Sequence, residues 1–194
     1  MDKPAWQIWY GGIPTETVDL IVEECEKYPA SESFIGSNSD NSRTDDSYRR
    51  SEISWINGRS PTSTFIAHEL IYRAHEANRR AWGFNITNTV SDIQYTKYHA
   101  KDNGFYSWHI DTFFLSNETA YDRKLSVVIQ LSDSNEYEGG NFKFDSTLPA
   151  PDPQLLRQKG TVIVFPSFLS HMVEPVTSGE RKSLVSWIEG PKFR

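Results

Sequence analysis

One stretch of the sequence predicts much of the fold and the site: Tyr106-Ser107-Trp108-His109-Ile110-Asp111-Thr112-Phe113-Phe114-Leu115. It is rich in aromatic and β-branched residues and alternates in polarity, which is typical of a β-strand. Residues two apart on a strand share a face, so His109 and Asp111 are expected to point at the same spot. Such a pair supplies two of the three ligands of a facial Fe(II) site. Two polar residues on a solvent-facing strand would give the same tripeptide.

His171 is the candidate third ligand, because a neighbouring strand can bring a distant histidine back to this pair. Ten residues later, Arg181 and Ser183 open an apolar run and would share a face of a strand. A guanidinium beside a hydroxyl is well suited to binding a carboxylate. The two groups together indicate a metal site with an acidic co-substrate. The alternative for Arg181 is a surface ion pair with Glu180 or Glu174.

Four motifs follow one another along the chain: His109-x-Asp111, Gly139-Gly140-Asn141-Phe142-Lys143-Phe144, Pro166-Ser167-Phe168-Leu169-Ser170-His171-Met172-Val173-Glu174-Pro175-Val176 and Arg181-x-Ser183. Their order and spacing resemble the Fe(II)/2-oxoglutarate-dependent oxygenases, and within them the prolyl 4-hydroxylase-like branch with its small PKHD-type members. The resemblance covers about residues 90–190. Residues 1–90 carry little of it.

From Val90 onward, short apolar runs alternate with turns, which favours a β-sandwich or barrel. The resemblance implies a double-stranded β-helix, or jelly roll, over residues 90–190. The predicted fold class is mainly β with flanking helices (α+β), in a single domain of residues 1–194. The expected strands are Ile93–Tyr98, Phe105–Phe113, Leu125–Leu131, Asn141–Phe144, Thr161–Phe165, Met172–Val176 and Lys182–Glu189.

Residues 1–90 are expected to support this core with helices. Residues 36–47 contain no apolar residue and predict a surface loop, either a plain connector or a lid that closes on substrate. The expected elements are a strand at Trp6–Tyr10, a helix capped by Thr15 and ending near Tyr28, a strand at Tyr48–Ile56, and a helix at Pro61–Trp82 with Phe65 on its apolar face.

The resemblance also implies roles for individual residues. Fe(II) would be bound by His109, Asp111 and His171, leaving positions for 2-oxoglutarate and O2, with ascorbate as an optional further cofactor. Arg181 would bind the distal carboxylate of 2-oxoglutarate, assisted by Ser183, Tyr98 and Gln130. Three aromatic residues near the metal strand are candidates for substrate contact or for the core: Tyr106, Trp108 and Phe113.

The resemblance implies hydroxylation of a substrate C–H bond, with a peptidyl proline as the leading substrate. Alternatives among enzymes are a free amino acid, another small metabolite or an alkylated base. Outside the enzymes, the alternative is a non-catalytic metal-binding jelly-roll module. The chain has 26 acidic and 20 basic residues and a net charge of −6, which argues against nucleic acid and anionic membranes as partners. The sequence does not predict an oligomeric state.

The remaining cysteine and histidines have structural interpretations. Cys25 is the single cysteine, which excludes an intramolecular disulfide, and its helical pattern favours a core or half-buried thiol over a nucleophile. The N-terminus has no signal pattern, so a cytoplasmic location is expected. His68 and His75 are expected to be exposed on a helix, because Tyr72 stands where a zinc-protease motif needs histidine. His99 is expected to play a structural role or to support the metal site.

Overall fold

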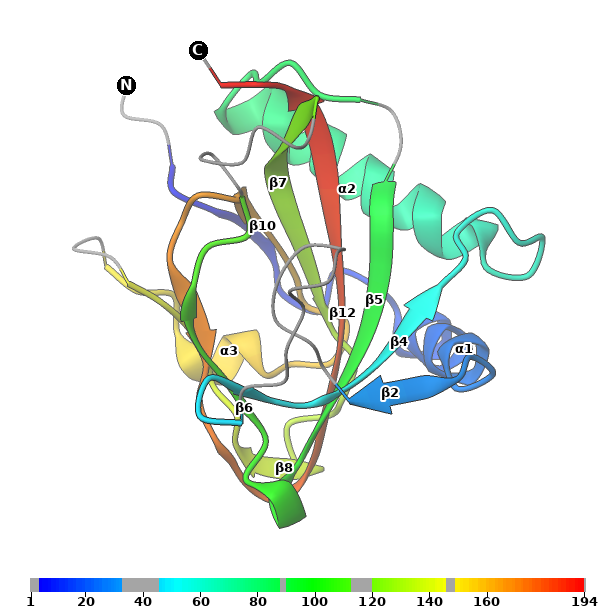
Figure 1. Cartoon of the computed structure of the whole chain (residues 1–194), viewed down its shortest axis with the longest axis vertical. Coiled ribbons are helices and arrows are strands. Elements are labelled where there is room, and N and C mark those ends of the chain that lie inside the picture. The colour runs from blue at the N-terminus through cyan, green and yellow to red at the C-terminus, as the bar shows by residue number, and fades with distance from the viewer. Residues whose placement is uncertain (1–3, 33–45, 88–89, 113–119, 146–148, 194) are drawn as a thin grey trace.

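The computed structural model in Figure 1 describes residues 4–32, 46–87, 90–112, 120–145 and 149–193, which form two antiparallel sheets and flanking helices. The larger sheet has the order β1-β10-β7-β12-β5-β4-β2, and β8 pairs with β12. Its strands are β1 (Gln7–Trp9), β2 (Ala30–Glu32), β4 (Glu52–Ile56), β5 (Val90–His99), β7 (Tyr121–Gln130), β8 (Tyr137–Gly139), β10 (Val162–Pro166) and β12 (Val176–Pro191).

The smaller sheet has the order β3-β6-β11-β9. Its short strands are β3 (Arg49–Arg50), β6 (Phe105–His109), β9 (Phe142–Phe144) and β11 (His171–Val173). The two sheets form the jelly-roll core, so the prediction of a mainly β fold with flanking helices is confirmed. Strands β1 to β4 come from the first 90 residues, which therefore contribute to both sheets as well as to the helices.

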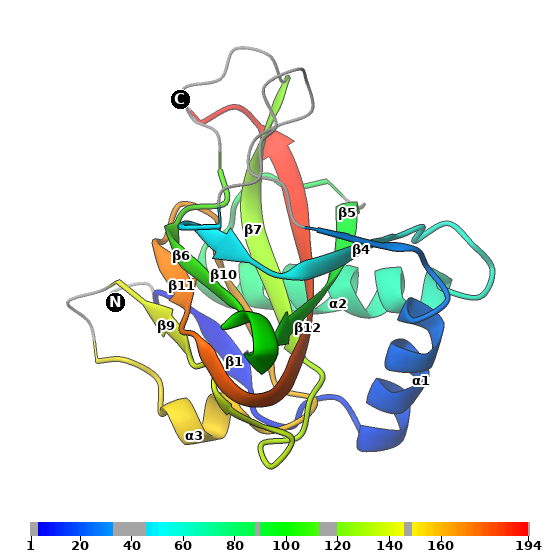
Figure 2. The same cartoon turned by 60° about the horizontal axis from the view of Figure 1, so that its bottom comes forward.

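Helices α1 (Thr15–Cys25) and α2 (Thr64–Ala81) cover the outer face of the larger sheet (Figure 2). Their apolar positions recur at helical spacing, and fully buried members include Ile21 of α1 and Leu70 of α2. Each such side chain contributes about 1.5–3 kcal/mol when it leaves water. A second, separate cluster fills the space between the sheets: Tyr98, Val128, Tyr137, Phe142, Phe144, Leu156, Ile163, Phe165, Val173 and Val176.

Most predicted strands differ from the observed ones at their ends, and for two of them the difference affects the site. The strand expected at Phe105–Phe113 ends at His109, and Phe113 lies outside the described residues. The strand expected at Tyr48–Ile56 divides at Ser51 into β3 and β4, which belong to different sheets because β3 pairs with β6 and β4 pairs with β5. The chain thus crosses from the smaller sheet to the larger one at this point.

The helix boundaries also differ from those predicted. Pro14, not the predicted Thr15, is the N-cap of α1, and its side chain makes no capping hydrogen bond. Thr15 is the first residue of the helix. Helix α2 begins at Thr64, and Phe65 is 38% exposed, because the buried face is formed by residues one position later in the turn, such as Ile66. Two strands, β2 and β8, and the short helices α3 (Pro153–Leu156) and η1 (Ala100–Asp102) were not predicted.

The possible lid at residues 36–47 lies outside the described residues except for its last two positions. Among the helices that the structure describes, none combines the length and apolar character needed to cross a bilayer.

Candidate metal and co-substrate site

Three side chains able to bind a metal meet where β6 ends and β11 begins. His109 is the last residue of β6, His171 is the first residue of β11, and the two pair across these antiparallel strands. Asp111 completes the group, and one potential ligand atom from each residue lies within 4.8 Å of the other two. All three side chains are at most 8% exposed. The structure therefore brings together the three residues that the sequence singled out.

Asp111 reaches this position by a different route from the one predicted. It lies two residues beyond the end of β6, so it does not share a strand with His109. Its backbone N–H instead donates to the carbonyl of Ser167 at 2.8 Å, in the turn between β10 and β11. One carboxylate oxygen, Oδ1, is 3.7 Å from Nε2 of His109, and the other, Oδ2, is 3.5 Å from Nε2 of His171.

Both histidines are oriented by a backbone carbonyl two residues earlier. Nδ1 of His109 is 2.8 Å from the carbonyl oxygen of Ser107, and Nδ1 of His171 is 2.9 Å from that of Leu169. A carbonyl only accepts, so each Nδ1 carries the proton and each Nε2 keeps its lone pair. The two lone pairs are directed at the space beside Asp111, which is how a metal-binding histidine is normally prepared.

The ionisation states fit a metal site. Burial lowers the pKa of His109 to about 4, and the nearby His171 acts in the same direction, so the imidazole is neutral at physiological pH. Burial opposes ionisation of Asp111, but the attraction of the histidines and hydrogen bonds from Ser126 and Trp187 outweigh it and lower the pKa of this carboxyl. Two imidazoles and one carboxylate are a donor set that suits Fe(II) and leaves coordination positions open.

Tyr106 packs directly against one of these histidines. Its ring stacks on His109 with centroids 3.5 Å apart and an interplanar angle of 14°. The guanidinium of Arg49, which comes from β3, lies 4.4 Å from the centre of the Tyr106 ring. Arg49 is buried and donates to Gln94 and Ser51 at 2.9 Å each. This stack of three side chains restricts the orientation of the His109 ring, and it was not predicted from the sequence.

Trp108, the second candidate for substrate contact, is not brought to the triad. Trp108 is 43% exposed, because it alternates with His109 and projects from the other face of β6. Phe113 belongs to the residues that the structure does not describe.

Arg181 lies deep in the larger sheet, on β12, and is only 3% exposed. Its Nη1 is 3.5 Å from Oγ of Ser183, and its guanidinium carbon is 5.6 Å from the centre of the Tyr98 ring. No carboxylate in the described part of the chain lies within 4.0 Å of it, although a buried guanidinium without an anion is costly. The arrangement can therefore accept a carboxylate from outside the protein.

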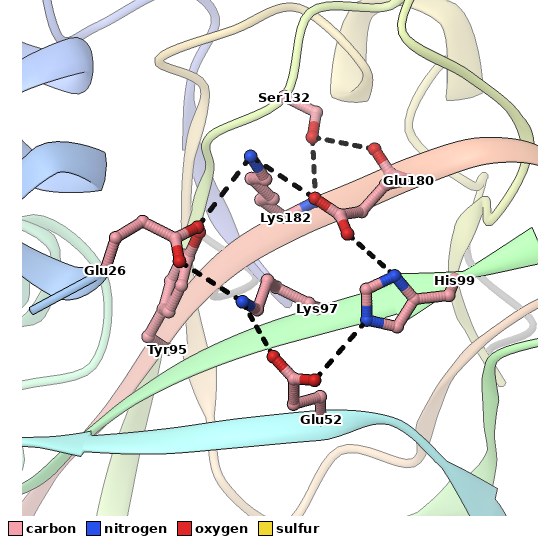
Figure 3. Close-up of polar contacts among 8 residues, drawn as sticks. All are labelled: Glu26, Glu52, Tyr95, Lys97, His99, Ser132, Glu180 and Lys182. Atoms are coloured by element: carbon pink, nitrogen blue, oxygen red, sulfur yellow. Dashed lines mark hydrogen bonds and ion pairs between the residues drawn. The ribbon is translucent and has the colours of Figure 1, made fainter. Parts of the chain in front are cut away.

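The alternative partners of Arg181 are occupied elsewhere. Glu180 accepts from Nδ1 of His99 at 2.7 Å and pairs with Lys182 at 3.3 Å, in the network that joins β5 and β12 in Figure 3. Glu174 pairs with Lys143 and accepts from Asn141. Neither glutamate forms an ion pair with Arg181, and the exposed ion pair considered from the sequence is not present.

The three residues expected beside Arg181 are all buried. Ser183 lies two residues from Arg181 on the same face of β12, and Tyr98 pairs with Arg181 in the β12–β5 register. Gln130 has other partners: its Nε2 donates to the hydroxyl of Tyr137 and to the carbonyl of Ser132, each at 3.1 Å. Tyr137 is thus a further residue near this end of the barrel that the sequence did not indicate.

The remaining histidines and the cysteine lie away from the triad. His99 belongs to the charged network of Figure 3, where its Nε2 is 3.8 Å from Glu52. His68 is exposed as predicted, but His75 is half-buried, with an Nε2 that has no hydrogen-bond partner among the described residues. Cys25 is fully buried, and burial raises the pKa of its thiol to about 12, as expected of a core residue.

Residues 93–189, half of the chain, match the family model described as the 2OG-Fe(II) oxygenase superfamily. The chain belongs to this superfamily. Membership implies Fe(II), 2-oxoglutarate and O2 as cofactor and co-substrates, and the His109, Asp111 and His171 group fits iron binding.

Curated relatives include two proteins named PKHD-type hydroxylase. The one from Colwellia psychrerythraea is 36% identical over 86 residues, which are 44% of this chain and 38% of the relative. The one from Synechococcus sp. is 33% identical over 122 residues, which are 63% of this chain and 52% of the relative. The chain thus matches about half or less of the length of these relatives.

Two solved structures share the fold. A prolyl-4-hydroxylase of Pseudomonas putida has a TM-score of 0.65 at 18% identity, covering 96% of this chain and 92% of that chain. The viral collagen prolyl hydroxylase of Paramecium Bursaria Chlorella virus-1 has a TM-score of 0.67 at 18% identity, covering 96% and 97%.

Proposed function

We propose that this chain is a single-domain Fe(II)- and 2-oxoglutarate-dependent dioxygenase that hydroxylates a C–H bond of its substrate. One observation carries the proposal: a buried group of two imidazoles and a carboxylate shares a barrel with a buried arginine that has no carboxylate partner among the described residues. A structural metal site alone would not require the arginine. A metal together with a dicarboxylate co-substrate accounts for both.

The protein's own residues have defined tasks in this scheme. His109, Asp111 and His171 would hold Fe(II), which supplies the activation of O2 while 2-oxoglutarate is oxidised to succinate and CO2. Arg181 binds the distal carboxylate of 2-oxoglutarate through charge-assisted hydrogen bonds, and the hydroxyl of Ser183 and the ring of Tyr98 lie beside its guanidinium. The apolar residues between the sheets exclude water from the space between the metal-binding residues and Arg181.

The proposed substrate is a peptidyl proline. Its support is the kinship with proteins named PKHD-type hydroxylase and the fold shared with prolyl hydroxylases. One of these, from Trichoplax adhaerens, was solved with a peptide fragment of hypoxia inducible factor, at a TM-score of 0.67 and 16% identity. Tyr106, the described residue among the predicted substrate contacts that packs on the triad, is placed to contact such a substrate, because it lies against the ring of His109.

The activity is tested by measuring succinate formed from 2-oxoglutarate with Fe(II) and ascorbate under air. We expect wild-type protein to produce succinate and His109→Ala or Asp111→Ala to produce none above background. His68→Ala is the matched control, because it removes an imidazole from the exposed side of α2. Wild-type protein that binds a divalent metal but forms no succinate under any condition would identify a non-catalytic module instead.

The substrate class is tested by incubating the active protein with proline-containing peptides and, separately, with free amino acids. Mass spectrometry is used to look for the gain of one oxygen atom. We expect the gain in a peptide, on proline. A gain only in a free amino acid would contradict the peptidyl substrate while leaving the oxygenase assignment intact.

A further inference from the structure

A serine on the larger sheet donates a short hydrogen bond to the candidate metal carboxylate. Ser126 lies in the middle of β7 and is fully buried, and its Oγ is 2.6 Å from Oδ2 of Asp111. An ionised carboxylate only accepts, so the serine hydroxyl is the donor. The bond therefore connects a strand of the larger sheet to the segment that follows β6 in the smaller one.

A second hydroxyl fixes the direction of this bond. Oγ of Ser167, which is also fully buried, is 3.0 Å from Oγ of Ser126. Because Ser126 has one proton and uses it toward Asp111, Ser167 must donate to Ser126. The Ser167 backbone is itself held in place, since its carbonyl accepts from the N–H of Asp111 and its own N–H donates to the carbonyl of Lys124. The carboxylate is thus oriented through both its backbone and its side chain.

The hydrogen bond also distinguishes the two carboxylate oxygens. Oδ2 of Asp111 receives the Ser126 proton, Oδ1 faces Nε2 of His109 at 3.7 Å, and Trp187 donates a further hydrogen bond to the carboxylate. A strong donor on Oδ2 competes with a metal for that oxygen. Coordination through Oδ1 alone occupies one position on the metal, and coordination through both oxygens would occupy two.

We propose that Ser126 is a positioning residue that keeps Asp111 a single-oxygen metal ligand, and that Ser167 supports it as the second member of a two-hydroxyl chain. This inference rests on the proposed function, because the position that Ser126 keeps free is one that 2-oxoglutarate or O2 requires. It goes beyond that function by assigning a task to a residue that need not touch metal, co-substrate or substrate.

The experiment uses Co(II) as a probe, because its visible absorption reports coordination without any turnover. Apo protein is titrated with Co(II) for wild type, Ser126→Ala, Ser167→Ala and the control Ser186→Ala. Ser186 is an equally buried serine that donates to the backbone of Asp92 and makes no contact with Asp111. It therefore reports what the loss of any buried serine hydroxyl does to the protein.

We expect Ser126→Ala to bind Co(II) about 10-fold to 100-fold more weakly than wild type and to show an altered visible spectrum. Ser167→Ala should show a smaller loss, and Ser186→Ala should keep wild-type affinity and spectrum even where its melting temperature falls. Ser126→Cys keeps the size of the side chain with a weaker donor, and its affinity should lie between those of wild type and Ser126→Ala. This variant serves as the test if Ser126→Ala does not fold.

Wild-type affinity and an unchanged spectrum in Ser126→Ala or Ser126→Cys would overturn the inference. An equal loss of affinity in Ser186→Ala would overturn it as well, because the effect would then be one of general stability. Failure of the proposed function has a different signature. Wild-type protein would bind Co(II) with the predicted dependence on Ser126 but would form no succinate with Fe(II) and 2-oxoglutarate.

Discussion

Replacing Arg181 by methionine should move stability and co-substrate affinity in opposite directions. The side chain is 3% exposed and has no carboxylate within 4.0 Å in the described part of the chain, so apo protein carries a buried charge without a protein counter-ion. Methionine has a similar length and no charge. The substitution removes the charge and leaves much of the packing against Tyr98 in place.

The size of both effects follows from this geometry. Truncating one partner of a buried, hydrogen-bonded charge pair costs about 2–5 kcal/mol, which corresponds to a rise in the dissociation constant for 2-oxoglutarate of about 30-fold to several thousand-fold. For the apo protein, an apolar replacement of a buried unpaired ion is expected to leave the free energy of unfolding unchanged or to raise it by on the order of 1 kcal/mol.

The assay is thermal unfolding with and without 2-oxoglutarate, under anaerobic conditions with a divalent metal present. A ligand at 100 times its dissociation constant stabilises the folded state by about 2.7 kcal/mol, so wild type should show a clear rise in melting temperature and Arg181→Met almost none. Lys182→Met is the matched control. Lys182 is the next cation on β12, but it pairs with Glu180 at the surface, so its loss should leave the response to 2-oxoglutarate intact.

Two results would refute this reasoning. A large loss of apo stability in Arg181→Met would show that the guanidinium is satisfied inside the protein and has a structural role. An undiminished response to 2-oxoglutarate would show that the carboxylate binds elsewhere. Either outcome separates the buried arginine from the co-substrate.

Three further predictions concern single positions. Gly140→Ala should lower the free energy of unfolding in urea by about 1 kcal/mol or more, because Gly140 has φ +60°. It should also lower the affinity for 2-oxoglutarate, because a Cβ at this position would lie 3.1 Å from Cδ of Arg181. Unchanged urea unfolding and unchanged 2-oxoglutarate binding would contradict the prediction. Cys25, with a thiol pKa of about 12, should resist iodoacetamide in native protein at about pH 8 and react fully in urea, as followed by mass spectrometry. Tyr95→Phe should cost about 1–3 kcal/mol in urea unfolding, since it removes the hydroxyl that donates to Glu26 at 2.6 Å (Figure 3); wild-type stability would show that the bond contributes nothing.

The positions of the site were predictable where they depended on local periodicity or on motif order. Arg181 and Ser183 share a face of β12 because the strand alternates, and both are buried. His171 was placed with His109 from the order of motifs, and the two pair in register. For Asp111 the predicted position was right and the reason was wrong, since it is held by Ser167 beyond the end of the strand.

What could not be predicted depends on contacts between distant segments. Ser126 lies in an apolar strand, and only the packing of β7 against the segment after β6 shows that its hydroxyl reaches Asp111. The guanidinium of Arg49 lies over Tyr106 because the two residues pair in the β3–β6 register. This pairing depends on the change of sheet at Ser51, which the apolar pattern of residues 48–56 does not reveal. The alternation of side chains along a strand predicts which residues share a face of that strand, but it does not predict which strand lies opposite them.

The two sheets contribute differently to the site. The smaller sheet is made of strands of two to five residues, and the β6–β11 pairing that carries both histidines includes only two register pairs and an irregularity between them. The larger sheet has long strands in β5, β7 and β12 and is covered by both long helices. Short ladders are weak by themselves, so the position of the triad depends on links to the larger sheet.

The Ser126–Asp111 hydrogen bond is one such link, and a metal bound by both histidines and Asp111 would cross-link β6 to β11. A molecule of 2-oxoglutarate bound to both this metal and Arg181 would connect the smaller sheet to β12 of the larger one. Co-substrate binding is therefore expected to stabilise the smaller sheet.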